Sequence, residues 1–335
     1  MLKSLGVFQD HTDGSLKSVF VHNENQIIEM TLLFNKPNKD VVCVPSHPFC
    51  NLGCKMCHLT NNNLNKCMVP IKFENFKEAL YKSLRDVEDS RITDKKKLLI
   101  SFMGVGEPLL NLGLIEEVFK HEEKIKEELG YENISYAIST MMPNDNVKKL
   151  TALVNDYSKP LKLHFSLHTP IDSERKELIP STNVSVTEAL DLLDYYRHCV
   201  KKNSEFVRAY GIFHEECEPI EIHYTLIKGV NDGEEELNLI TTLLSRYNIP
   251  IKFIRFNPKT DMSISENEDK WVSTIENVAG VKVKTYSPPG REIGSSCGEF
   301  TKHYYHEELE TEEERQEFLY WEKKHKVILT KKVLE

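Results

Sequence analysis

The sequence Cys43-Val-Pro-Ser-His-Pro-Phe-Cys50-Asn-Leu-Gly-Cys54-Lys-Met-Cys57 holds four of the chain's eight cysteines within fifteen residues. Cys50, Cys54 and Cys57 form a CxxxCxxC triplet, and Cys43 lies seven residues before it. Soft thiolate ligands select zinc, copper(I) or iron–sulfur clusters over hard cations. Structural zinc sites are usually closed by four ligands, whereas three thiolates leave one position open, which suits a [4Fe-4S] cluster. The triplet therefore predicts a cluster site, and zinc with Cys43 or Cys67 as fourth ligand is the alternative.

The composition limits the class of protein. With 335 residues and 40% hydrophobic content, the chain can form one large domain or two modest ones. No apolar run approaches the ~18 residues that span a bilayer, and the N-terminus lacks the apolar segment of a signal peptide. The other cysteines are scattered, which is typical of a reducing compartment: Cys67, Cys199, Cys217 and Cys297. We therefore expect a cytoplasmic protein with no membrane contact.

The net charge of −9 does not indicate general nucleic-acid binding, which usually leaves a basic footprint. Net charge affects long-range steering, however, and does not limit what a local patch binds. The short basic runs at 95–97 and 201–202 are interpreted as solvated faces.

Apolar periodicity predicts strands that alternate with helices after residue 73. The predicted strands lie at 97–103, 134–139, 161–166, 220–227, 251–256 and 281–285, after a strand or hairpin at 24–34 and a short strand at 41–42. The predicted helices lie at 73–87, 112–129, 145–155 and 186–199, and from 232 onward. This alternation implies βαβ units and a parallel sheet. About six units predict an α/β fold with a partial (β/α)6 TIM-like barrel, and a flat doubly wound sheet is the alternative. We expect a short N-terminal extension (1–38), a core barrel (39–300) and a charged helical tail (301–335).

Short polar motifs follow several of the predicted strands. They are Gly104-Val-Gly-Glu-Pro-Leu-Leu-Asn111, Ser139-Thr140, Ser166-Leu-His168 and Asn257-Pro258. Each is weak alone, because a Gly-x-Gly pair is more often a tight turn and a lone strand-end histidine is usually structural. In parallel α/β folds, however, the loops after the C-terminal strand ends meet at one mouth. Their convergence predicts a binding site there.

At this point the motifs resemble a known family, the RlmN/Cfr-type radical S-adenosylmethionine (SAM) RNA methyltransferases, which modify adenosine in 23S rRNA and, for some members, tRNA. The resemblance runs in register from about Glu29 to Gly298. Besides the cysteine stretch and the 104–111 motif, it rests on Ser166-Leu-His-Thr-Pro170, Gly229-Val-Asn-Asp232, Arg255-Phe-Asn-Pro258 and Ser295-Ser-Cys-Gly298.

The resemblance implies a barrel of the radical SAM type that binds SAM at its C-terminal face. Cys50, Cys54 and Cys57 would hold the [4Fe-4S] cluster. The positions that match SAM contacts in the family are Gly106, Glu107, Ser139, Ser166, Leu167, His168 and Asn257. Cys297 matches the cysteine that carries a methyl group, and Cys43 matches the second catalytic cysteine. Glu29 matches the acid/base glutamate.

The family's scheme explains the two lone cysteines. C2 and C8 of adenine carry non-acidic C–H bonds, so the electrophilic methyl of SAM cannot attack them by ordinary displacement. The thiolate of Cys297 first takes a methyl from one SAM, and a radical from a second SAM activates that methyl. Cys43 then resolves the enzyme–RNA adduct by forming a disulfide bond with Cys297. The resemblance thus implies that a monomer methylates an adenine of rRNA or tRNA, at C2 rather than C8, with electrons from a donor such as flavodoxin or ferredoxin.

Two alternatives remain open at this point. About forty residues precede Cys43, where family members usually carry an accessory domain, which favours a non-RNA substrate such as a protein, a nucleotide or a small molecule. The other alternative is a zinc- or cluster-bearing binding protein that has lost catalysis. Retention of Cys43, Cys297 and the SAM-type loops argues against that second alternative.

Overall fold

One eleven-stranded sheet organises the part of the chain that the computed structural model describes, which is residues 2–22, 26–36, 38–61, 69–86, 96–200, 218–258, 262–294 and 312–327. The strand order is β10-β9-β8-β7-β6-β5-β4-β3-β2-β1-β11. The strands are β1 (Lys3–Gln9), β2 (Leu16–His22), β3 (Gln26–Leu33), β4 (Asp40–Cys43), β5 (Lys97–Phe102), β6 (Asn133–Thr140), β7 (Leu161–Ser166), β8 (Ile220–Tyr224), β9 (Ile251–Ile254), β10 (Val283–Tyr286) and β11 (Lys326–Val327).

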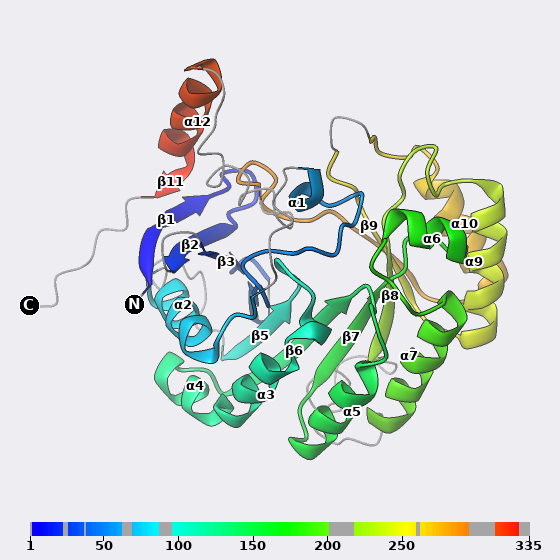
Figure 1. Ribbon diagram of the computed structural model, residues 1–335, viewed down its shortest axis with the longest axis horizontal. Coiled ribbons are helices and arrows are strands. Elements are labelled where there is room, and N and C mark those ends of the chain that lie inside the picture. The colour runs from blue at the N-terminus through cyan, green and yellow to red at the C-terminus, as the bar shows by residue number, and fades with distance from the viewer. Residues whose placement is uncertain are drawn as a thin grey trace, which may run out of the picture.

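The strands from β4 to β10 are all parallel, and helices connect each of them to the next. The helices are α1 (His58–Asn61), α2 (Phe73–Asp86), the 3-10 helix η2 (Pro108–Leu110), α3 (Leu112–Lys120), α4 (Glu122–Leu129), α5 (Val147–Asp156), α6 (Asp172–Leu178), α7 (Val186–Val200), α9 (Glu234–Tyr247), α10 (Glu268–Ala279) and α12 (Glu312–His325). Helices cover the outside of the sheet, as Figure 1 shows. The predicted succession of six βαβ units is confirmed.

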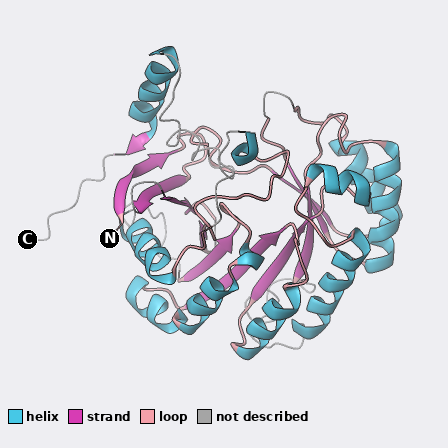
Figure 2. Ribbon diagram, in the orientation of Figure 1, coloured by secondary structure: helices cyan, strands magenta, loops and turns pink. Residues whose placement is uncertain are grey.

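The sheet curls into a partial barrel. Cys43 of β4 and Tyr286 of β10, at opposite ends of the parallel part, line the same cavity. Among the described strands, β10 and β11 form the two ends of the sheet and are not paired with each other, so the barrel is open (Figure 2). This architecture confirms the predicted partial barrel and excludes the flat doubly wound sheet.

The two faces of the parallel strands differ in chemistry. On β7, Leu161, Leu163 and Phe165 are fully buried in the core that the helices cover. The intervening Lys162 and His164 line the cavity inside the barrel. Because successive side chains of a strand point to opposite faces, this alternation puts the apolar residues against the helices and the polar residues into the interior.

Helix boundaries follow local signals in the sequence. The predicted helix at 112–129 is two helices, because the backbone at His121 (φ −101°, ψ 10°) leaves the helical conformation between α3 and α4. Gly130 ends α4 in the left-handed conformation (φ 73°). A capping box precedes α7: Ser185 N–H donates to Glu188 Oε2 (2.9 Å), and Glu188 N–H donates to Ser185 Oγ (3.2 Å).

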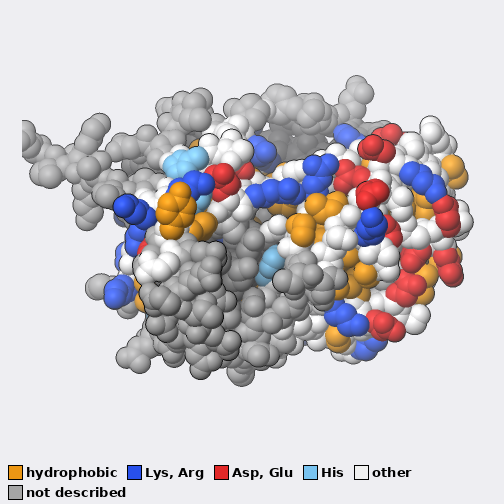
Figure 3. All heavy atoms as spheres, turned by 90° about the horizontal axis from the view of Figure 1, so that it is seen from above, with side chains coloured by type: hydrophobic (Ala, Val, Ile, Leu, Met, Phe, Trp, Pro, Cys, Tyr) orange, Lys and Arg blue, Asp and Glu red, His pale blue; other side chains and the backbone are white. Residues whose placement is uncertain are grey.

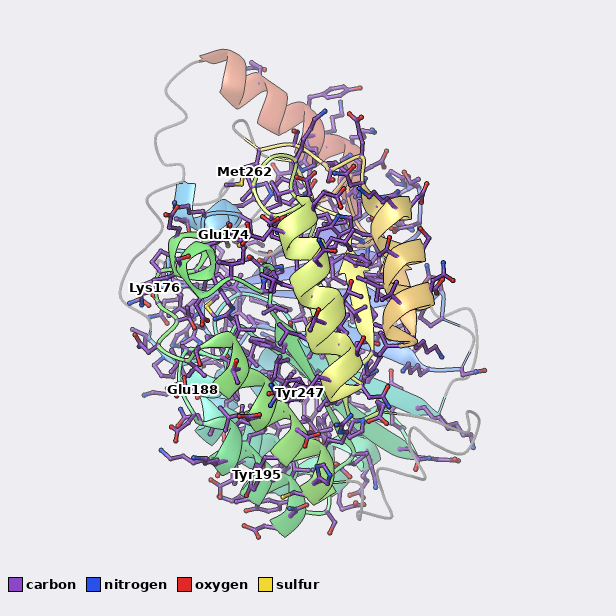
Figure 4. All side chains as sticks on the ribbon, turned by 90° about the vertical axis from the view of Figure 1, so that its right-hand side faces the viewer. Glu174, Lys176, Glu188, Tyr195, Tyr247 and Met262 are labelled. Atoms are coloured by element: carbon purple, nitrogen blue, oxygen red, sulfur yellow. The ribbon has the colours of Figure 1, made fainter. Side chains whose placement is uncertain are left out.

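The outer layer beside β7–β9 consists of α7, α9 and α10, which Figure 4 shows side by side. Tyr247, at the C-terminal end of α9, donates its hydroxyl hydrogen to Asp191 of α7 at 2.7 Å. Tyr224 of β8 packs against Trp271 of α10, with ring centroids 5.3 Å apart. These contacts fix the helices against the strands whose inner faces line the cavity. None of the described helices is both long and apolar enough to cross a membrane.

The N-terminal region forms three antiparallel strands, β1–β3, that continue the barrel sheet through β4. Only β3 corresponds to the strand predicted at 24–34. β2 escaped prediction because both of its faces are buried, including the polar residues Lys17 and Ser18, so it has no apolar–polar alternation. α6 and α10 were also not predicted; α6 has seven residues, and α10 buries only Trp271 and Ile275. α12 lies in the charged helical tail predicted at 301–335.

Candidate active site

A cavity of about 760 Å³ lies inside the barrel. Its walls come from the inner faces of the strands β3 to β10 and from the loops that follow them. The predicted site residues that line it are Cys43, Cys57, Ser139, Ser166, His168 and Asn257. The sequence motifs after separate strands therefore do converge on one space.

The cysteine triplet lies in the loop between β4 and α1. Cys54 is buried with Leu178 and Ile179, while Cys50 and Cys57 both pack against Leu59 and Val105 in a neighbouring cluster. Burial raises the pKa of the Cys50 thiol to about 12 and that of Cys54 well above its ordinary value, and the neighbouring thiols raise both further. Coordination to a metal centre would offset this cost, because a coordinating thiol is deprotonated.

The spacing of the three thiols bears on whether they are preformed around a single ion. A tetrahedral zinc ion with Zn–S bonds of about 2.3 Å would hold its sulfur ligands about 3.8 Å apart. Among the described residues, the group of His, Cys, Asp or Glu side chains with ligand atoms within 4.8 Å of one another is His164, Glu221 and His223, and not the cysteine triplet. The three thiols are therefore not arranged as a preformed site for one zinc ion.

Gly104 and Gly106 let the 104–111 loop contact the start of the cysteine loop. Val105 O accepts from the backbone N–H groups of Ser46 (2.9 Å) and His47 (3.2 Å). A Cβ atom at Gly104 would lie 2.8 Å from the carbonyl carbon of Val44. Gly106 has φ +101°, and a Cβ there would lie 2.6 Å from Ser46 Oγ. Glycine at these two positions therefore allows the close backbone packing that orients the cysteine loop.

Glu107 is fully buried beside the cysteine loop. Its Oε1 accepts from Leu109 N–H (3.0 Å) and its Oε2 accepts from Met141 N–H (3.1 Å). Burial raises the pKa of this carboxyl to about 7, against the lowering effect of its hydrogen bonds with Thr140 and these amides. A cationic group beside it, such as the amino group of SAM, would favour the ionised form.

The ends of β6 and β7 bring two serines together. Ser139 Oγ lies 3.1 Å from Ser166 Oγ. His168 adopts a left-handed backbone (φ 62°), and its Nδ1 accepts from Thr225 N–H at 3.1 Å, so its other ring nitrogen carries the proton. Burial lowers the pKa of His168 to about 3. The side chain of Leu167 is buried in the core. Its backbone N–H donates to the carbonyl oxygen of His223, and its carbonyl oxygen accepts from Arg175 Nε.

Two buried residues that sequence reasoning missed hold this arrangement. Arg175 of α6 donates to the carbonyl oxygens of Met141 (2.6 Å), Ser166 (3.3 Å) and Leu167 (3.2 Å). Asn231 donates to the carbonyl oxygen of His168 at 2.5 Å. Arg175 thus fixes the backbone of Ser166 and Leu167, and Asn231 fixes that of His168. Asn231 lies inside the Gly229–Asp232 motif, whereas Arg175 had no signal beyond its position in a short charged segment.

Glu29 and Cys43 lie near a third missed residue, Lys17. Lys17 is only 1% exposed, and its Nζ donates to Glu29 Oε2 (2.8 Å) and to the carbonyl oxygen of Gly294 (3.1 Å). Burial raises the pKa of the Cys43 thiol to about 11, although Lys17 lowers it. Cys297 lies outside the described residues, as does Cys67.

The loop that leads toward Cys297 is held by the N-terminal strands. The turn between β1 and β2 supplies two carboxylates: Asp13 Oδ2 accepts from Gly290 N–H (2.7 Å), and Asp10 Oδ2 accepts from Glu292 N–H (2.9 Å). With the Lys17 bond to Gly294, these contacts fix the backbone at 290–294 against β1–β3. The N-terminal strands are thus part of the site.

The barrel has a counterpart among solved structures. A crystal structure of a radical SAM methyltransferase from Sphaerobacter thermophilus has the same fold, with a TM-score of 0.70, 21% sequence identity and coverage of 89% of this chain and 80% of that one. No family model matches the chain.

Two curated proteins are similar to most of this chain. The probable dual-specificity RNA methyltransferase RlmN of Lachnospira eligens is 26% identical over 307 residues, which cover 90% of this chain and 79% of the relative. That of Clostridioides difficile is 27% identical over 300 residues, which cover 88% and 78%. The chain is therefore similar to curated RlmN methyltransferases along about nine-tenths of its length.

Gly104→Ala should destabilise the protein, because the new Cβ meets Val44 and Pro45 backbone atoms at 2.8–2.9 Å. Overpacking of this kind costs about 1–3 kcal/mol. Gly113→Ala, in α3, is the matched control: an added Cβ meets nothing within 4 Å, and helical Gly→Ala changes are stabilising by roughly 0.5–1 kcal/mol. Urea denaturation measures both. Equal unfolding free energies for the two variants would contradict the packing role.

The raised pKa of Glu107 predicts a pH-dependent stability. The folded pKa, about 7, exceeds the unfolded value of 4.5, so the folded state binds more protons between these values and its stability falls as pH rises from about 4.5 to 7. The loss is on the order of 3 kcal/mol. Glu107→Gln should lack this part of the pH dependence when cluster-free wild type and variant are unfolded at pH 5 and pH 7.5. Parallel pH profiles would show that the carboxyl is ionised throughout.

Proposed function

We propose that the chain is a radical SAM methyltransferase that methylates a ring carbon of an RNA adenine, C2 rather than C8, with Cys297 as the methyl carrier and two SAM per turnover. The observation that carries the proposal is the buried Lys17, which joins Glu29 on β3 to the carbonyl of Gly294. The similarity to RlmN relatives along about nine-tenths of the chain supports it.

The Lys17 contacts bear on the pairing of the two cysteines. Thr31 pairs with Cys43 in the sheet register, and Glu29 lies two residues before Thr31 on the same strand. Gly294 precedes Cys297 by three residues, and three residues span at most about 11 Å. The chain thus ties the segment that carries Cys297 to the strands that carry Glu29 and Cys43. A thiol pair that must form a disulfide bond during turnover requires such proximity.

The residues around the cavity suit binding and orientation. Cys50, Cys54 and Cys57 would hold a [4Fe-4S] cluster, which, with SAM at its open iron, supplies one-electron cleavage of SAM to a 5′-deoxyadenosyl radical. Glu107 offers a buried carboxylate beside the cysteine loop for the amino group of SAM. Ser139, Ser166, His168 and Asn257 offer hydrogen-bonding groups along one wall. Gly106 and Leu167 contribute through the backbone.

The protonation state of Cys43 and the position of Glu29 suit the second half of the reaction. With a pKa near 11, Cys43 rests as a thiol and becomes a nucleophile only when a base removes its proton. Glu29 pairs with Lys17 and is 6% exposed, so its carboxylate is shielded from water beside the cysteine. We assign Glu29 the acid/base role and Cys43 the release of the enzyme–RNA adduct as a Cys43–Cys297 disulfide.

The substrate base must leave its stack to reach this interior. Enzymes that modify a ring carbon of a base act on single strands or extrude the nucleotide into a pocket. The coloured part of the face in Figure 3 mixes basic and acidic side chains, so that part offers no broad positive surface to RNA. A small electron-transfer protein such as flavodoxin or ferredoxin would reduce the cluster.

Cys43→Ala tests the proposal, because an adduct that cannot be resolved should accumulate. We expect Cys43→Ala, with reconstituted cluster, SAM, reductant and cellular RNA, to form a covalent protein–RNA species that survives denaturing electrophoresis. Cys199→Ala, whose cysteine is on α7, is the matched control and should behave as wild type. The double variant Cys43→Ala/Cys297→Ala should form no adduct.

Several outcomes would contradict the proposal. Normal RNA methylation by Cys43→Ala would exclude the two-cysteine route. An adduct that persists in the double variant would remove Cys297 from the methyl-carrier role. If SAM is still cleaved but neither an adduct nor methylated RNA forms, the substrate is not RNA.

A further inference from the structure

Arg175 of α6 is a buried cation whose direct contacts among the described residues are all with neutral groups. Its side chain is 1% exposed. Four oxygens accept from its guanidinium: the carbonyl oxygens of Met141 (2.6 Å), Ser166 (3.3 Å) and Leu167 (3.2 Å), and Thr182 Oγ1 (2.6 Å). The hydrogen bonds of Arg175 are thus largely satisfied, but no carboxylate of the described residues forms an ion pair with it.

The charge of Arg175 needs an explanation beyond its hydrogen bonds. A buried charge is costly unless it is paired, even where neutral groups accept from it. A neutral amide side chain could also donate to carbonyl oxygens. Burial lowers the pKa of Arg175 to about 10, while the negative charges of Asp172 and of Cys54 in its thiolate form raise it. The guanidinium is therefore charged at neutral pH, and its charge acts on these two groups.

Of these two groups, only Cys54 shares the buried environment of Arg175. Asp172 is exposed, and water screens the interactions of exposed charges. Cys54 is 8% exposed, and Met141 contacts both groups: its carbonyl oxygen accepts from Arg175, and its sulfur lies 3.7 Å from Cys54 Sγ. Charges interact more strongly through protein than through water. A thiolate at Cys54 is therefore stabilised by Arg175.

The segment that carries Arg175 also holds the cysteine loop. Two hydrogen bonds join them: Lys55 N–H donates to the carbonyl oxygen of Leu178 (2.9 Å), and Ser181 Oγ donates to that of Leu52 (2.7 Å). Ile179 packs against Cys54. Figure 4 locates α6 by the labelled Glu174 and Lys176, the chain neighbours of Arg175. The contacts of α6 thus place a fixed positive charge beside the cysteine loop.

We propose that Arg175 raises the reduction potential of the iron–sulfur cluster through its positive charge. The inference rests on the proposed function, in which the thiolates of Cys50, Cys54 and Cys57 hold a [4Fe-4S] cluster. Net charge is one of the factors that set the potential of such a cluster. Uptake of one electron from the donor protein adds one negative charge, so a buried cation favours the reduced form. Arg175 thereby eases the reduction that precedes SAM cleavage.

Redox titration of the full chain with its cluster reconstituted, without SAM, tests the inference. Electron paramagnetic resonance follows the reduced cluster, and iron and sulfide are measured first so that fully loaded chains are compared. Arg175→Met should lower the equilibrium constant for reduction at least tenfold, a shift of ~59 mV to more negative potential for one electron. Arg175→Lys keeps the charge and should titrate close to wild type. Arg246→Met, at an exposed arginine near the end of α9, is the matched control and should titrate as wild type.

A second pair of variants changes the charge while Arg175 stays in place. Thr182 Oγ1 accepts from Arg175 Nη1, so Thr182→Asp puts a carboxylate against the guanidinium. Thr182→Asp should therefore shift the potential in the same direction as Arg175→Met. Thr182→Asn is its neutral control and should leave the potential unchanged. The Thr182 pair replaces Arg175→Met as the test if that variant does not fold or holds no cluster.

Several results would overturn the inference. One is a potential for fully loaded Arg175→Met equal to that of wild type. Another is an equal shift in Thr182→Asp and Thr182→Asn, or in Arg175→Met and Arg175→Lys, because a structural disturbance and not the charge would then be the cause. A wild-type chain that takes up no cluster would overturn the proposed function as well, whereas a full cluster with an unshifted potential would overturn the inference alone.

Discussion

The structure depends on the alternation of apolar and polar side chains along its parallel strands. On β7 and β8, residues such as Leu163 and Ile222 are fully buried in the core that the helices cover, while Lys162 and His223 line the cavity inside the barrel. A strand cannot shift by one residue without exchanging the two sets. The packing that stabilises the barrel therefore also determines which side chains face its interior. It also positions the loops that follow the strands.

The cysteine loop is positioned by backbone contacts as much as by its own sequence. The close approach at Gly104 and Gly106 places the 104–111 loop against Val44 and Ser46, and Glu107 then lies beside the thiols. On the other side, Lys17 joins Glu29 to Gly294. The barrel and the antiparallel N-terminal strands thus each contribute one side of the site.

Much of the fold was predictable because the parallel strands and their helices have regular periodicity and clear signals such as Gly130 and the Ser185–Glu188 capping box. The convergence of Ser139, Ser166, His168 and Asn257 followed from the topology alone. β2 was not predictable, because burial of Lys17 among apolar residues removes the alternation that marks a strand. The polar side chains inside the barrel were missed for a related reason: Lys162, His164 and Glu221 occupy the polar positions of their strands, which sequence alone does not distinguish from a solvated face. Their burial becomes visible only once the sheet has curled.

The central claim is that Cys297 carries the methyl group between SAM and the substrate. Its most direct test is peptide mass spectrometry of the Cys297 peptide after anaerobic cluster reconstitution and incubation with SAM labelled in its methyl group. The account predicts one labelled methyl on Cys297 and none on that peptide from Cys297→Ser. An unmodified Cys297, in a protein with an intact cluster that still cleaves SAM, would contradict it.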